Sequence, residues 1–158
     1  MSIKIKFTIG GYWYNGLYTT KIFIDDDKSC KIFQERASTI DISDRRFRNI
    51  RDDDENFFRF GNDKTYEAKI SDEMLAELDA LNIFAWESSY VILGFDGEEW
   101  ALVLTDGERI YRGIGARNYP PNFEEFRAWI DKLVEAVRVN DTTNQIHDRQ
   151  RRKWLQER

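Results

Sequence analysis

The chain has 158 residues, of which 41% are hydrophobic and 34% charged, and this balance excludes a disordered protein. A single cysteine excludes an intramolecular disulfide, and one cysteine with one histidine cannot complete a four-ligand zinc site. The N-terminus lacks the apolar run of a signal peptide and no segment reaches the length of a membrane span, so we expect a cytoplasmic protein without membrane contact.

Charged residues are distributed unevenly along the chain. Residues 1–140 carry 19 Lys and Arg against 26 Asp and Glu, whereas residues 141–158 carry 5 against 3. We expect one domain over 1–140 and a basic, polar tail, helical or disordered, over 141–158. An acidic body disfavours a general DNA-coating protein and suits a basic protein partner. Aromatic residues reach 15%, which is more than a minimal core needs.

Alternation of apolar and polar residues predicts a strand over residues 3–9, followed by strands over 17–24 and 29–34. The turn signals between them are Gly10-Gly11, Asn15-Gly16 and Asp25-Asp26-Asp27. A hairpin is expected over 57–60 and 65–70. Ser71 is a favourable helix N-cap, and the helix that it opens should end near Asn82.

Three further strand-like runs cover residues 90–95, 100–104 and 110–113, separated by Asp96-Gly97 and Asp106-Gly107. Asp-Gly between apolar runs is a hairpin signal, so a three-stranded meander is expected. Asn122, with Glu125 three residues later, predicts a capping box for a last helix. The predicted fold class is α+β: antiparallel sheet or sheets built from hairpins and a meander, with two main helices packed on the sheet and a C-terminal helical tail.

Residues 96–133 contain a Trp-x-Leu strand, an Asp-Gly turn, a Tyr-x-Gly strand and an Asn-x-Tyr-Pro loop, carried by Trp100, Leu102, Asp106, Gly107, Tyr111, Gly113, Asn118, Tyr119 and Pro120. In this order the pattern resembles that of small, uncharacterised bacterial α+β proteins. This likeness implies no activity. The Gly10-Gly11-Tyr12 turn after the first strand is also similar to that of emfourin, a protein inhibitor of bacterial metalloproteases, although Trp13-Tyr14-Asn15 departs from that family. The second likeness implies an inhibitor or a binding module.

Candidate catalytic groups are few. His147 lies in the polar tail, away from any packed element that could orient a triad. Glu67 and Lys69 share one strand face, as half of a nuclease site would, but that chemistry needs another carboxylate on the neighbouring strand. The acidic runs Asp25–Asp27 and Asp52–Asp54 offer clustered oxygens without the spacing of an EF-hand loop, so metal binding there stays open. We expect no cofactor.

Two segments are candidates for binding a partner. Tyr12, Trp13 and Tyr14 are consecutive aromatics that cannot all face one core, and Tyr and Trp are enriched at interface hot spots. An arginine cluster could grip phosphates, or could simply form surface ion pairs with the acids that follow it; it comprises Arg45, Arg46, Arg48 and Arg51.

The sequence therefore favours a non-catalytic, intracellular protein-binding module that acts by occupying a partner, of the inhibitor, immunity or phage anti-defence type. One alternative is a protein that binds or cleaves nucleic acid through the arginine cluster or through Glu67 and Lys69. Another is a structural protein that self-associates through residues 141–158.

Overall fold

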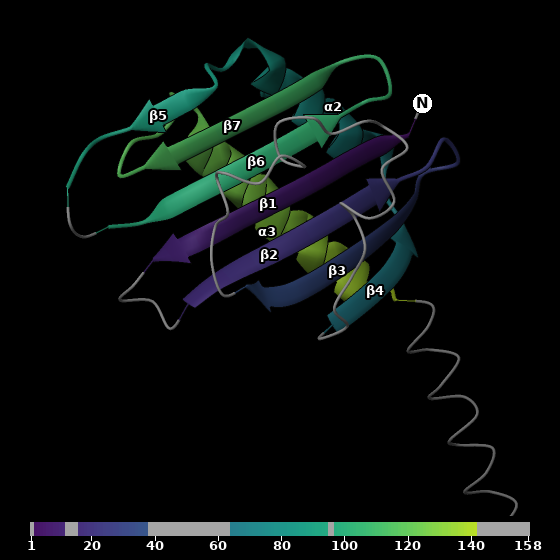
Figure 1. Cartoon of the computed structure of the whole chain (residues 1–158). Helices are drawn as coiled ribbons and strands as arrows, with labels where there is room; N and C mark the ends of the chain where they lie inside the picture. The colour runs from purple at the N-terminus through teal and green to yellow at the C-terminus, as the bar shows by residue number, and fades with distance from the viewer. Residues whose placement is uncertain (1, 12–15, 38–63, 95–96, 142–158) are drawn as a thin grey trace, which may run out of the picture.

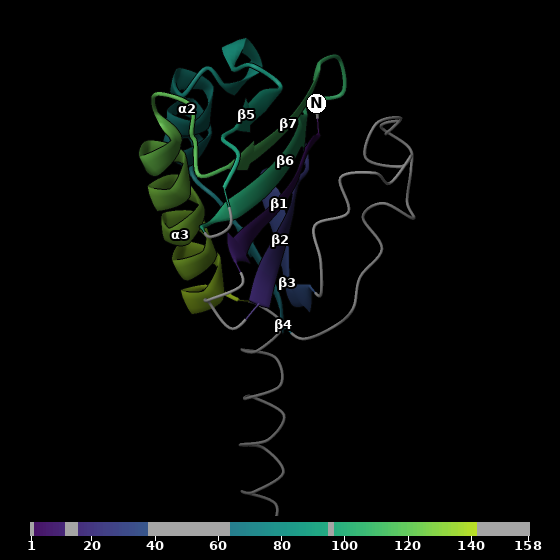
Figure 2. The same cartoon turned by 60° about the vertical axis from the view of Figure 1, so that its left-hand side comes forward.

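The computed structural model describes residues 2–11, 16–37, 64–94 and 97–141. These residues form one seven-stranded sheet with two helices on a single face (Figures 1 and 2). The strands are β1 (Ile3–Gly11), β2 (Gly16–Ile24), β3 (Ser29–Ala37), β4 (Lys64–Lys69), β5 (Ser89–Val91), β6 (Glu99–Thr105) and β7 (Ile110–Ala116). The helices are α2 (Asp72–Ala80) and α3 (Phe123–Val139), and a short 3₁₀ turn covers Ile83–Ala85.

The strand order across the sheet is β4-β3-β2-β1-β6-β7-β5. Every neighbouring pair is antiparallel except β5 and β7, which are parallel, so the sheet is mixed. Hairpin-rich strands with helices on one side confirm the α+β class. The expected hairpin over 57–60 and 65–70 cannot be compared as a whole, because residues 57–63 lie outside the described part; β4 itself pairs with β3.

The expected three-stranded meander is wrong because its first strand, β5, does not pair with its second strand, β6. Strands β6 and β7 form the predicted hairpin, with Thr105 opposite Ile110, but β5 pairs with β7 rather than β6. A strand has two hydrogen-bonding edges, and β6 gives one to β7 and the other to β1. Only the outer edge of β7 is then available to β5. The chain reverses once between β5 and β6 and again in the β6–β7 hairpin, so β5 and β7 run in the same direction.

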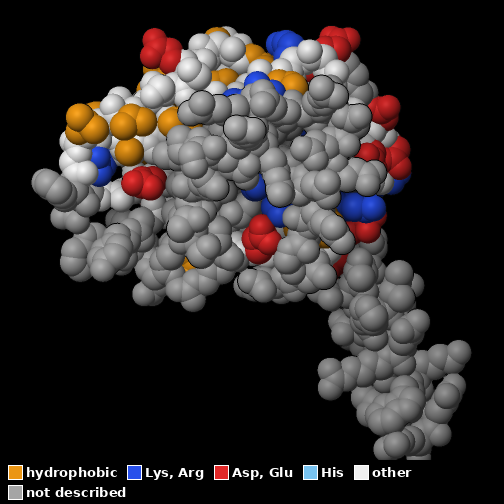
Figure 3. Space-filling view, in the orientation of Figure 1, with side chains coloured by type: hydrophobic (Ala, Val, Ile, Leu, Met, Phe, Trp, Pro, Cys, Tyr) orange, Lys and Arg blue, Asp and Glu red, His pale blue; other side chains and the backbone are white. Residues whose placement is uncertain are grey.

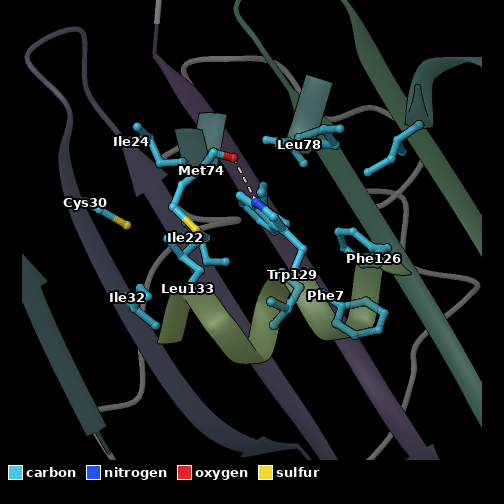
Figure 4. Close-up of a cluster of buried hydrophobic side chains, with 14 of the residues drawn as sticks. Phe7, Ile22, Ile24, Cys30, Ile32, Met74, Leu78, Phe126, Trp129 and Leu133 are labelled. Carbon is cyan, nitrogen blue, oxygen red and sulfur yellow. Dashed lines mark hydrogen bonds between the residues drawn. The ribbon is translucent and has the colours of Figure 1, made fainter. Parts of the chain in front are cut away.

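The core lies between the sheet and the helices (Figure 4). The alternation in β1 places Ile5 and Phe7 on this side, as predicted, and both are buried. On α3 the apolar stripe faces the sheet: the buried positions are Phe123, Phe126, Trp129, Ile130, Leu133 and Val137. Edge-to-face contacts join the layers, with the ring centres of Phe7 and Phe126 separated by 5.1 Å.

The two predicted helix caps have different outcomes. Ser71 caps α2 as expected, because its Oγ accepts a hydrogen bond from the Met74 N–H at 3.3 Å. Asn122 precedes α3, but its side chain makes no capping bond. Its amide instead donates to the Leu81 carbonyl at 2.6 Å, and its Oδ1 accepts from Trp86 Nε1 at 2.7 Å. The side chain thus joins the start of α3 to the end of α2.

No helix within the described ranges is long and apolar enough to cross a membrane.

Candidate interaction surface

The main sequence-predicted binding residues lie outside the described ranges. Gly11 and Gly16 are paired at the end of the β1–β2 hairpin, and Tyr12, Trp13 and Tyr14 belong to its connection. The arginine cluster (Arg45, Arg46, Arg48 and Arg51), the acidic run 52–54 and the tail from 142 onward also fall outside. Their roles stay predictions.

Glu67 and Lys69 share one face of β4, as the period-two pattern predicted, and this is the face opposite to Ala68, which is buried in the core. Their partners on β3 are Lys31, opposite Glu67, and Ser29, opposite Lys69. The register therefore supplies a lysine and a serine where the nuclease chemistry needs a carboxylate. Within the described ranges, no three His, Cys, Asp or Glu side chains come close enough together to hold a metal ion.

Asp25–Asp27 form a tight turn between β2 and β3. The Lys28 N–H donates to the Asp25 carbonyl at 2.9 Å, and Lys28 has a φ of 66°. Asp27 Oδ1 accepts a hydrogen bond from the Ser29 N–H at 3.0 Å, and this bond is the main cause that lowers the pKa of Asp27. Asp27 thus contributes its carboxylate to the turn itself.

Three consecutive exposed apolar side chains begin at the last residue of β5 and continue into the chain that follows it. Val91 is 45% exposed, Ile92 50% and Leu93 94%. Strand β5 is the last strand of the sheet, and hydrophobic side chains gather over this corner of the molecule in Figure 3. We call residues 91–93 the β5 patch. Contiguous exposed apolar side chains of this kind are typical of an interaction surface.

The start of β5 is fixed by two tyrosines. Tyr90 packs beside the buried Trp100, with ring centres 6.1 Å apart, and its hydroxyl accepts a hydrogen bond from the Glu87 N–H at 2.9 Å. The Tyr111 hydroxyl donates to the Glu87 carbonyl at 2.7 Å, and burial raises the pKa of this phenol above its usual value. The strand is therefore held against the domain although its last residues are exposed.

Arg117 contacts the middle of the β5 patch and the glycines that follow the patch. The Arg117 N–H donates to the Glu98 carbonyl at 2.9 Å, and the guanidinium donates to the Ile92 carbonyl. Its side chain passes so close to Gly94 and Gly97 that a Cβ at Gly97 would overlap it. Gly97 also has a φ of 141°, which favours glycine. Arg117 thereby supports the chain that displays the patch.

A separate cavity of about 340 Å³ lies between α2, the 3₁₀ turn and the ends of β1 and β6. Its walls are mainly apolar, with Asp79, Asp106 and Arg109 at the polar part of the lining. Arg109 lies 4.0 Å from the centre of the Phe84 ring and donates to Asp106 Oδ2 from Nε and Nη2.

The carboxylate in this cavity is committed to the β6–β7 turn. Burial alone would raise the pKa of Asp106, but the N–H groups of Arg109 and Glu108 donate to Oδ1, and together with the Arg109 guanidinium they lower it. Asp106 is therefore a structural anion. The described lining holds no nucleophile paired with a base, so the cavity offers no arrangement for covalent catalysis.

Cys30 is fully buried on β3, and burial raises the pKa of its thiol from 9.0 to about 12. We predict that iodoacetamide at pH 8 modifies Cys30 at least a hundredfold more slowly in the native protein than in urea. Intact-mass spectrometry over time measures both rates. Equal rates would show that β3 opens readily.

The raised pKa of the Cys30 thiol also makes stability depend on pH. The contribution of the neutral thiol to stability is fully present below pH 9 and is lost as the pH rises from 9 to 12.

The β5 patch was missed by sequence reasoning, which interpreted residues 90–95 as the first strand of a meander. A continuous apolar run is typical of a strand covered on both faces, so the run itself pointed inward. A search against protein-family models finds no match, and a search of the curated proteins finds no similar protein.

Proposed function

We propose that the protein is a non-catalytic binding module that acts by occupying a partner protein. The observation that carries this proposal is the β5 patch, where three consecutive aliphatic side chains are displayed at the edge of the sheet. Burying these side chains on a partner would supply the apolar centre that stable protein interfaces need. The net charge of −5 favours a basic partner.

The chemistry of the described residues supports the same proposal. Cys30 is buried, the cavity beside α2 lacks a nucleophile with its base, and Glu67 faces Lys31 rather than a second carboxylate. The nucleic-acid alternative rests on the arginine cluster, and the self-association alternative on residues 141–158.

Leu93→Lys is expected to weaken partner binding at least tenfold without destabilising the fold, because Leu93 is almost fully solvent-exposed. The matched control is Val139→Lys, which places the same new charge on an exposed aliphatic residue at the end of α3. Tagged wild-type protein and both variants would be used to capture partners from host lysate after nuclease treatment, with quantitative mass spectrometry and then a measured Kd.

Equal capture of a protein by Leu93→Lys and by the wild type would show that the β5 patch is not part of the interface. The next variant would then replace Tyr12, Trp13 and Tyr14 together with alanine. Loss of every partner on nuclease treatment would favour the arginine cluster. A solution mass that falls to that of the monomer when residues 141–158 are deleted would favour self-association.

A further inference from the structure

We propose that the outer edge of β5, which pairs with no further strand among the described residues, accepts an extended strand from the partner, one that alternates apolar and basic residues. This inference rests on the proposed function and specifies how its interface is built. The partner strand would become the eighth strand of the sheet, hydrogen-bonded to the outward backbone groups of Ser89 and Val91. The aliphatic side chains of the β5 patch would pack against it.

The hydrogen bonds of β5 show which backbone groups point outward. The Ile114 N–H donates to the Ser88 carbonyl at 3.1 Å, and the Ile92 N–H donates to the Ala116 carbonyl at 2.9 Å. In a parallel ladder, alternate residues bond to the same neighbour, so Ser88, Tyr90 and Ile92 face β7. The N–H and carbonyl groups of Ser89 and Val91 are therefore not used in the ladder with β7, and Val91 in addition forms an isolated antiparallel bridge with Arg117, just beyond the end of β7.

The two edges of the sheet differ in how they are protected. At the β4 edge, the buried Asp141 accepts a hydrogen bond through Oδ1 from the Glu67 N–H at 3.1 Å. Natural edge strands are commonly blocked by charges, prolines or such covers. Residues 88–95 contain neither a charged residue nor a proline. Of the described edges, β5 is thus the one suited to pairing with another strand.

The charged residues near β5 indicate which kind of strand would bind there. Exposed Glu87 directly precedes β5, and exposed Glu99 lies across Ala116 from Val91, since both residues pair with Ala116. The Arg117 guanidinium, bound to the Ile92 carbonyl, offsets one of these two negative charges, so the three side chains together carry a charge of −1. A second copy of this chain would bring a further net charge of −5 to the same edge. A strand with lysine or arginine between apolar residues would instead place positive charge near these glutamates.

The probe is a capped seven-residue peptide that alternates lysine and valine, added to the full-length protein. Its binding is expected to slow amide exchange at Ser89 and Val91, measured by NMR, while the Tyr90 amide, which faces β7, changes little. A glutamate–valine peptide, and a lysine–valine peptide N-methylated at alternate residues, are each expected to bind at least tenfold more weakly. Failure of the lysine–valine peptide to bind, or equal binding of the N-methylated form, would overturn the proposal.

The matched pair of variants is Val91→Pro and Val91→Thr. Proline removes an N–H that does not bond to β7, so the domain should keep its fold, as circular dichroism would check. Threonine keeps both the N–H and the branched shape. We expect the proline variant to lose at least tenfold in peptide affinity and the threonine variant less than threefold. Equal losses would mean that the backbone edge is not used.

These outcomes separate the inference from the proposed function. A partner that is lost with Leu93→Lys but binds Val91→Pro and Val91→Thr equally would keep the binding module and overturn strand addition. If the peptides bind with the expected pattern but no protein partner is captured, strand addition at β5 would be supported and the proposed binding module would be overturned. A dimer in sedimentation that Val91→Pro dissociates would assign the edge to a second copy and overturn the proposed occupant.

Discussion

Trp100→Ala is expected to lower the free energy of unfolding by about 3–5 kcal/mol. The indole is fully buried, and its ring centre lies 4.9 Å from that of Phe123 at the start of α3. Its Nε1 also donates to the Asn118 carbonyl at 3.0 Å, so the substitution removes packing and a hydrogen bond together. Urea unfolding followed by circular dichroism measures the change. A loss below about 1 kcal/mol would contradict this account of the core.

Gly115 provides the control for that variant. It faces Trp100 across the β6–β7 ladder, and a Cβ at this position would overlap the indole. Gly115→Ala alone is therefore expected to cost about 1–3 kcal/mol through overpacking. In the Trp100→Ala background the added methyl group enters vacated space, so its cost should fall or change sign. Strictly additive costs in this double-mutant cycle would show that the glycine has another role.

Trp129→Ala is expected to cost a similar amount, about 3–5 kcal/mol, and to loosen α2 selectively. Trp129 is buried on α3, and its Nε1 donates to the Met74 carbonyl at 2.9 Å, which joins the two helices (Figure 4). Hydrogen exchange by mass spectrometry should show faster exchange in residues 72–80 than in the central strands.

Trp129→Phe separates the two contributions of this side chain. Phenylalanine keeps most of the apolar contact but loses the bond to Met74, so it should cost about 1 kcal/mol relative to the wild type. Exchange in α2 that rises no more than exchange in β1 and β2 would contradict a specific link between the helices.

Local features of the fold were predictable because they depend on neighbouring residues. The alternation from Ile3 to Ile9 determines which side of β1 contributes Ile5 and Phe7 to the apolar core, whatever the strand pairs with. Ser71 caps α2 because a serine oxygen reaches the N–H three residues later in any helix. The apolar stripe of α3 follows from its 3.6-residue period.

The choice of neighbour in the sheet was not predictable in this way. The Asp106-Gly107 turn joins β6 to β7 as its local chemistry requires, but nothing near Tyr90 shows that β1 occupies the other edge of β6. The prediction that Asn122 caps the last helix was wrong for the same reason. Its side-chain amide forms hydrogen bonds to Leu81 and Trp86, which are distant in the sequence, and not to the N–H groups of its own helix.

The candidate surface depends on this long-range pairing. Val91, Ile92 and Leu93 form an apolar run that would be buried in an internal strand and is exposed in an edge strand. Composition is the same in both cases, so only the position of β5 beside β7 distinguishes them. Tyr12, Trp13, Tyr14 and the arginine cluster stay predictions from the sequence.

The place of β1 in the sheet has a consequence for biosynthesis. Strand β1 pairs with β2 directly after the turn, but its other neighbour, β6, starts only at Glu99. Local hairpins form in microseconds, whereas joining distant segments requires a large loss of chain entropy before its contacts compensate. A nascent chain that ends before β6 therefore leaves one edge of β1 open. Lys4 and Lys6, interleaved with Ile3 and Ile5, are the kind of charges that keep such an edge from pairing with other nascent chains.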